Sequence, residues 1–145
     1  MPNPGPSTTV TANAQSVTTQ QCLRLIAFAK GLSVNQAGDV AIPIIGPTTS
    51  FVPTTVVTTN ANVTMATATV GIYTAPAQGG TAILTTAALT GQTTQAFAYV
   101  RAATAAAANV TTAGFYLYVN VGVTVAGGTV DLYLYGYDTS ALTSP

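Results

Sequence analysis

The residues that could take part in chemistry are few and lie far apart. The chain of 145 residues carries three acidic and three basic side chains, one cysteine and no histidine. General acid–base catalysis draws mainly on His, Asp, Glu, Lys, Tyr and Cys held close together at tuned pKa values. A catalytic triad or a carboxylate pair therefore has few parts to use, and we predict that the protein is not an enzyme. The charged residues are Arg24, Lys30, Asp39, Arg101, Asp131 and Asp138.

The same scarcity argues against several classes of ligand. Structural zinc sites are built from clusters of Cys and His, and Cys22 stands alone. Nucleic-acid binding needs clustered basic groups, whereas this chain has three cations and a formal net charge of +0. No stretch approaches the roughly 18 apolar residues of a membrane-spanning helix. We therefore expect no cofactor, no metal, no nucleic-acid partner and no membrane partner.

Low charge also bears on how the protein stays in solution. Charged residues make up 4% of the chain, against about 25% in an ordinary soluble domain, and the mean hydropathy is +0.46. A net charge near zero promotes association, and a free monomer normally shows a surface of mixed charge. The alternative is a Thr-rich neutral surface that stays hydrated without partners. We favour the first interpretation and predict oligomerisation or assembly.

The chain length fits a single domain, and composition divides the sequence into three parts. We predict an extended N-terminal arm at residues 1–19, a β-sandwich domain at 20–139 and a C-terminal tail at 140–145. The arm is rich in Pro, Ser, Thr, Asn and Ala, a composition that does not form a packed core, and it lacks the basic and apolar regions of a signal peptide. It is either a free terminus or an arm that orders on a neighbouring subunit. For the second case the candidate contact residues are Pro4, Pro6 and Val10.

Within the domain, short apolar β-prone runs alternate with Gly, Pro and Asn, a pattern typical of an all-β sandwich or barrel. Pro43 cannot donate to a β-ladder, so its strand is expected at a sheet edge or at a bulge. Residues 101–113 are expected to form a long loop that contains a helical turn. The predicted strands are 22–30, 39–45, 52–59, 64–73, 81–85, 95–100, 115–125 and 129–137.

The last two of these strands have the clearest pattern. Aliphatic side chains occupy every second position through both of them, which is typical of β-strands. The intervening Gly127-Gly128 suits the positive φ angles of a tight turn, so we predict a two-residue hairpin. Register then places all the aliphatic residues on one face. The expected pairs are Ala126 with Thr129, Val125 with Val130, Val123 with Leu132, and Val121 with Leu134.

The opposite face of that hairpin would carry five tyrosines. Tyrosine combines a large apolar body with a polar tip and is enriched at protein interfaces. We therefore predict a contact surface there, with the alternative that another sheet or a loop covers this face inside the domain. The candidate interface residues are Tyr116, Tyr118, Tyr133, Tyr135 and Tyr137.

Five segments, taken in order, carry a resemblance to a known class of proteins. They are GDVAIPI at 38–44, VVTTNA at 56–61, GIYTAP at 71–76, GGTAI at 79–83 and DLYLYGYD at 131–138. In this order they resemble small proteins encoded among the head genes of tailed bacteriophages, over about residues 22–139. Members of that class that decorate or cement the capsid are often jelly-roll or related β-sandwich proteins. The resemblance thus implies a single-domain, jelly-roll-like β-sandwich of about eight antiparallel strands, with no catalytic residues.

The function that we expect from this resemblance is structural. The protein would decorate or cement the outer surface of a bacteriophage capsid, bridging subunits of the major capsid protein, as a homo-oligomer (dimer or trimer). The alternative is a receptor- or carbohydrate-binding module of a phage fibre or spike, because jelly rolls also serve as lectins and exposed tyrosines stack on sugars. A Thr-rich ice-binding solenoid would need a fixed repeat, which this sequence lacks.

Overall fold

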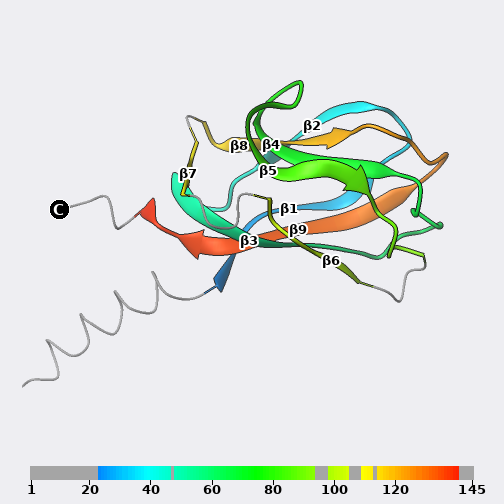
Figure 1. Cartoon of the computed structure of the whole chain (residues 1–145), viewed down its shortest axis with the longest axis horizontal. Coiled ribbons are helices and arrows are strands. Elements are labelled where there is room, and N and C mark those ends of the chain that lie inside the picture. The colour runs from blue at the N-terminus through cyan, green and yellow to red at the C-terminus, as the bar shows by residue number, and fades with distance from the viewer. Residues whose placement is uncertain (1–22, 47, 94–97, 105–108, 113, 141–145) are drawn as a thin grey trace, which may run out of the picture.

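The computed structural model describes residues 23–46, 48–93, 98–104, 109–112 and 114–140. These residues form nine β-strands and no helix, arranged as two antiparallel sheets that lie face to face (Figure 1). The predicted all-β sandwich is therefore confirmed. The strands are β1 (Leu23–Ser33), β2 (Gly38–Pro43), β3 (Ser50–Thr59), β4 (Thr69–Ala75), β5 (Gly79–Ala88), β6 (Tyr99–Ala102), β7 (Val110–Thr111), β8 (Tyr116–Val121) and β9 (Thr129–Asp138).

The strand order is that of a jelly roll. Sheet A has the order β1-β9-β3-β6, with the short β7 also paired to β3, and sheet B has the order β2-β8-β4-β5. Strands from the two halves of the chain pair in nested fashion: β1 with β9, β2 with β8, β3 with β6 and β4 with β5. Such nesting results when one long antiparallel ribbon is wound around a common core, as in the jelly roll. Sheet B is the upper layer and sheet A the lower layer in Figure 1.

The core lies between the two sheets. Leu132 and Leu134 of β9 are fully buried from the side of sheet A, and Leu117 and Val119 of β8 are fully buried from the side of sheet B. Burial of each such aliphatic side chain contributes about 1.5–3 kcal/mol. Because successive side chains of a strand point to opposite sides, the residues between these aliphatics face outward. The outward rows are the surfaces that remain for contacts with other molecules.

The prediction for the strand that contains Pro43 is confirmed. Pro43 is the last residue of β2, and β2 is an edge strand of sheet B. An edge position leaves one side of the strand without a ladder, so the missing N–H of proline costs no sheet hydrogen bond there.

The predicted hairpin between the last two strands is wrong. β8 pairs with β2 and β4 in sheet B, whereas β9 lies between β1 and β3 in sheet A. The turn itself does form, because the Gly128 N–H donates to the Val125 carbonyl at 3.0 Å. Beyond it the chain changes sheets, and the Val125 N–H donates to the carbonyl of Val34 at 3.0 Å. The aliphatic rows of the two strands share one core because they face each other across the sandwich, an arrangement that alternation alone does not distinguish from side-by-side pairing.

Most predicted strand boundaries differ from the structure by a few residues, and two of them show why. The strand expected at 64–73 begins only at Thr69, since the chain before it turns, with the Ala68 N–H donating to the Met65 carbonyl at 2.9 Å. The strand expected at 115–125 ends at Val121, where the chain leaves sheet B.

The stretch expected as a long loop with a helical turn is only partly described. Its described residues contain the end of β6 and all of β7, both paired with β3. Residues 94–97, which include half of the strand predicted at 95–100, lie outside the described residues, as do 105–108 and 113. The predicted arm at 1–19 and the tail beyond Ser140 lie outside them as well.

Candidate contact surface

The outer side of sheet A carries a continuous apolar surface, which we call the tyrosine face. It is built by register, because residues paired across neighbouring antiparallel strands project on the same side of the sheet. One row joins Phe28, Tyr133, Val57 and Val100, a second joins Leu25, Tyr135, Thr55 and Ala102, and a third joins Leu23, Tyr137 and Val52. These eleven residues come from β1, β9, β3 and β6.

Large apolar groups on this face are exposed. Val100 has 58% of its surface accessible, Leu23 has 50% and Tyr137 has 40%. Phe28 stacks on Tyr133 with ring centroids 6.4 Å apart and an angle of 18° between the rings. The outer face of an antiparallel sheet usually carries polar residues, so an aromatic and aliphatic row in this position marks a candidate contact surface.

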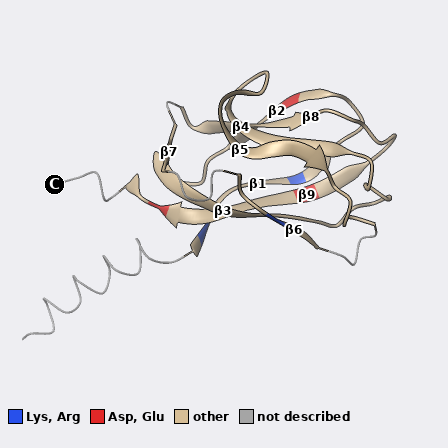
Figure 2. Ribbon diagram, viewed as in Figure 1, with Lys and Arg blue, Asp and Glu red and all other residues tan. Residues whose placement is uncertain are grey.

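Charge is confined to the margin of the tyrosine face. Asp131 lies at one end, where its carboxylate accepts hydrogen bonds from the Asn60 amide at 2.8 Å and the Gly31 N–H at 2.7 Å. The hydrogen bond from Asn60 has the largest effect and, with that from Gly31, holds the pKa of Asp131 below its ordinary value, although burial opposes the shift. Figure 2 shows the charged positions as a few narrow bands on the strands, and the eleven residues of the face include none of them.

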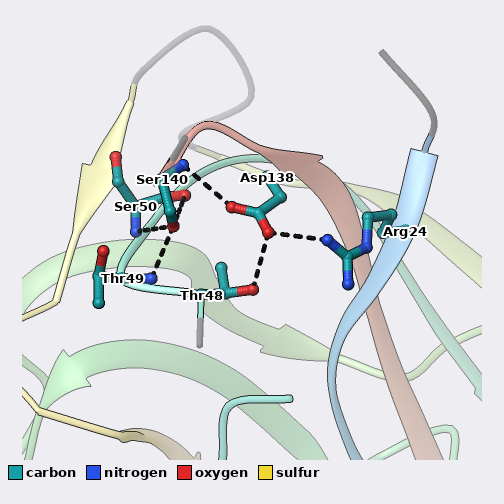
Figure 3. A network of polar contacts seen from close by, with 6 residues as sticks. All are labelled: Arg24, Thr48, Thr49, Ser50, Asp138 and Ser140. Carbon is teal, nitrogen blue, oxygen red and sulfur yellow. Dashed lines mark hydrogen bonds and ion pairs between the residues drawn. The ribbon is translucent and has the colours of Figure 1, made fainter. Parts of the chain in front are cut away.

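The opposite end of sheet A is closed by a polar network (Figure 3). Arg24, near the start of β1, forms an ion pair of 2.8 Å with Asp138, the last residue of β9. The same carboxylate accepts hydrogen bonds from the Thr48 hydroxyl at 3.1 Å and the Ser140 N–H at 3.0 Å. This network fixes the corner at which the chain enters and leaves the sandwich.

Two opposing effects act on the pKa of Asp138. Burial, the largest single effect, raises the pKa, but the hydrogen bonds from Ser140 and Thr48 together with the charge of Arg24 outweigh it. The net result is a pKa below the ordinary value, so Asp138 is ionised near neutral pH and the ion pair is present.

The five predicted tyrosines do not share one face. Tyr133, Tyr135 and Tyr137 lie on the tyrosine face of sheet A, whereas Tyr116 and Tyr118 lie on the outer side of sheet B. The separation follows from the change of sheets between β8 and β9, which turns the outward rows of the two strands to opposite sides of the sandwich. The other predicted contacts, at Pro4, Pro6 and Val10, lie outside the described residues.

Part of the outer side of sheet B is covered by the chain itself. The turn between β4 and β5 folds over it, with Ala77 and Gln78 in the left-handed region at φ 56° and 58°. Asp39 accepts hydrogen bonds from the Ala77 N–H at 2.6 Å and from the Asn120 amide at 2.8 Å. Gln78 donates to Asn120 at 2.9 Å, and Asn120 is 8% exposed. The row of Asp39 and Asn120 on this face is therefore polar and covered, whereas Tyr116 and Tyr118 lie in the two rows beyond it.

The residues that surround the three tyrosines on sheet A were not predicted from the sequence to lie on a contact surface. Leu23, Leu25 and Phe28 come from a strand that is apolar on both sides, and a bulge between Leu25 and Ala27 shifts its alternation. Val57 and Val100 belong to two strands that pair with each other although they are far apart in the sequence. The excess of apolar residues at 22–30 could have indicated this surface, because a strand with one solvent-exposed face needs apolar residues only on its other face.

The metal-ligating side chains of the described residues do not cluster. Among them, no group of three or more His, Cys, Asp or Glu could hold a metal ion. No helix within the described ranges is long and apolar enough to cross a membrane. No protein-family model, curated protein or solved structure matches the chain.

Proposed function

We propose that the protein is a structural virion protein that decorates and cements the outer surface of a bacteriophage capsid by bridging subunits of the major capsid protein. The sequence resemblance to head-gene products suggests the setting, and the tyrosine face is the observation that carries the proposal. A sandwich with few charges, whose aromatic face the other described residues leave exposed, is suited to being packed among other subunits. The physical task would be to hold a seam of the shell closed against outward pressure.

The energetics of such a clamp depend on apolar burial. Stable protein interfaces bury about 1,200–2,000 Å² in total, and apolar area contributes roughly 25 cal/mol per Å² before other terms. Lost motion and ordering of side chains remove much of this gain. Many copies on one shell multiply the remainder, so a modest affinity per copy is enough to stabilise the whole particle.

The ends of the domain add a second means of contact. Leu23 begins β1 at the border of the tyrosine face, so residues 1–22 join the domain beside that face. An arm that orders on a neighbouring subunit extends the contact beyond the sandwich at the cost of its ordering entropy.

Copy number in purified virions tests this proposal. Quantitative mass spectrometry should find hundreds of copies per particle, in a simple ratio to the major capsid protein. Tens of copies would indicate a fibre or spike component instead, and absence from the virion would refute a structural role in it.

A receptor- or carbohydrate-binding module is the second candidate. It is favoured by exposed aromatic rings, since Tyr116 is 52% exposed and Tyr137 is 40% exposed, and aromatic rings are common stacking surfaces for sugars. A glycan array distinguishes the two functions, because a cement protein gives no hits whereas a lectin gives a defined set.

A further inference from the structure

We propose that the tyrosine face binds a second copy of this chain, so that two sandwiches pack face to face about a two-fold axis that runs along the strands between β9 and β3. This inference deepens the proposed function and rests on it, since the dimer is the unit that would attach to the shell. It names both the partner of the surface and the geometry of the contact.

The size of the face fits a dimer. Its extent is set by four strands spaced about 4.8 Å apart and by the length of about 13 Å from Tyr133 to Tyr137 at about 3.3 Å per residue. With side-chain width included, the face measures about 25 Å by about 20 Å, or about 500 Å² on each copy. Two copies would bury about 1,000 Å², which is below the range of about 1,200–2,000 Å² for stable interfaces but matches the roughly 1,000 Å² expected of the smallest biological interfaces.

The charge distribution favours a copy of the same chain as the partner. In a two-fold contact the same patch meets itself, so any charge in its centre would face a like charge. The eleven residues of the tyrosine face carry no charge, and Asp131 at its margin is hydrogen-bonded and close to Lys30. Self-association therefore buries apolar surface without burying an unpaired charge.

The sizes of the side chains select the axis. β1 and β9 contribute Leu, Phe and Tyr to the face, whereas β3 and β6 contribute Val, Thr and Ala. An axis along the strands between β9 and β3 lays the bulky half of one copy on the small half of the other. Tyr135 then lies over Thr55 of the partner subunit, and Phe28 lies over Val100 of the partner subunit. An axis across the strands would instead place the bulky strands β1 and β9 on the same two strands of the partner subunit.

The same axis gives the dimer a direction. Because rotation about the strand direction leaves that direction unchanged, the corners held by Arg24 and Asp138 lie at the same end in both copies. Both N-terminal segments then leave the dimer at one end, where two arms could reach neighbouring shell subunits together.

The test is analytical ultracentrifugation of the full chain with three variants at exposed positions. Wild type should sediment as a dimer at micromolar concentration. Val100→Asp and Phe28→Lys should each weaken the dimer about tenfold or more, because each places a charge in an apolar contact. Tyr116→Lys, at an equally exposed tyrosine on the opposite face, should change nothing.

Mixing the two variants tests the axis itself. Val100 and Phe28 lie on opposite edges of sheet A within one copy, but the proposed axis brings Phe28 of one copy to Val100 of the partner subunit. A mixture of Val100→Asp and Phe28→Lys should therefore form a mixed dimer more readily than either variant alone. Failure of two folded variants to rescue each other would overturn the geometry.

A wild-type monomer at about 100 µM, or a dimer that only Tyr116→Lys disrupts, would overturn the inference as a whole. Tyr137→Lys serves in place of either variant that circular dichroism shows to be unfolded. Cosedimentation with shells is measured separately. A dimer that does not bind shells refutes only the proposed function, and a monomer that binds them refutes only the inference.

Discussion

Asp138 connects three parts of the chain through its one carboxylate. Its carboxylate contacts Arg24, Thr48 and Ser140, and these residues come from the start of β1, the approach to β3 and the end of β9. Replacement by alanine leaves the partners without their shared acceptor in a partly buried site. Hydrogen bonds to charged groups are worth about 1.5–3 kcal/mol each in favourable cases.

We expect Asp138→Ala to lower the free energy of unfolding by about 2–3 kcal/mol, measured by urea denaturation near neutral pH. Lys30→Ala provides the control, since Lys30 is exposed and forms no hydrogen bond or ion pair within the described residues. Equal stability of Asp138→Ala and wild type would show that the corner network does not hold the sandwich closed.

The three aspartates also set the response to acid. Asp39, Asp131 and Asp138 all have pKa values lowered by the folded structure. The unfolded chain, whose aspartates have an ordinary pKa of about 3.9, therefore binds more protons than the native state as pH falls. Stability from these groups is present above about pH 4 to 5 and is lost as the pH drops through the native pKa values.

We therefore expect the free energy of unfolding to stay nearly constant from about pH 5 to about pH 8 and to fall below about pH 4. Chemical denaturation at a series of pH values measures this profile. Because the chain has no histidine, a loss of stability between about pH 7 and about pH 5 would contradict this assignment of the titrating groups.

At the scale of the strands, β3 and β9 are in tight backbone contact at a bulge. The register of β3 shifts between Pro53 and Thr55, opposite Gly136 of β9. A Cβ added at Gly136 would collide with the carbonyl oxygen of Val52 and lie 3.1 Å from the Cα of Pro53. Both are backbone atoms of a paired strand, so they cannot move aside as a flexible side chain can.

We expect Gly136→Ala to destabilise the fold by about 2 kcal/mol or more, as overpacking of a core does. Gly114→Ala is the control, because a Cβ there meets nothing within 4 Å and should cost less than about 0.5 kcal/mol. Thermal unfolding of the two variants compares them directly. A Gly136→Ala protein as stable as wild type would mean that the bulge does not bring these strands together.

Much of the strand layout could be predicted from the sequence, but the pairing of the final strands could not. Alternation marks which side of β8 and β9 is buried, and the inward positions Val119 and Leu132 were assigned correctly. Alternation does not say whether two inward rows lie side by side or face each other, and the glycine turn at residues 127–128 is compatible with both. The winding of the jelly roll decides between them, and that depends on contacts between residues far apart in sequence.

The candidate surface was predictable to the same extent. Tyr133, Tyr135 and Tyr137 do project to one side together, as their spacing indicates. The error was to add the tyrosines of β8, which lie on the other sheet. Phe28 and Val100 complete the surface only because β1 and β6 flank the central pair of sheet A, and no local pattern in the sequence gives that order.

For the whole molecule, the chain outside the described sandwich offers a separate test. Deletion of residues 1–19 removes none of the described strands, so the thermal unfolding midpoint should change by less than about 4 °C, the shift that about 1 kcal/mol produces in a domain of this size. If the arm orders on a neighbouring subunit, the same deletion should weaken binding to shells by about tenfold or more. Equal binding by the truncated and full-length proteins would assign attachment to the sandwich alone.

The low charge of the whole molecule, at 4% of its residues, leads to the central claim, that contacts without charge attach this protein to a shell. Contacts between exposed charges weaken strongly as salt rises, whereas apolar contacts do not. The most direct measurement is binding of the purified chain to shells that lack it, at about 0.05 M and about 1 M NaCl. We predict saturable binding with affinities that agree within about threefold at the two salt concentrations. Absence of binding, or release of the protein at high salt, would contradict the claim.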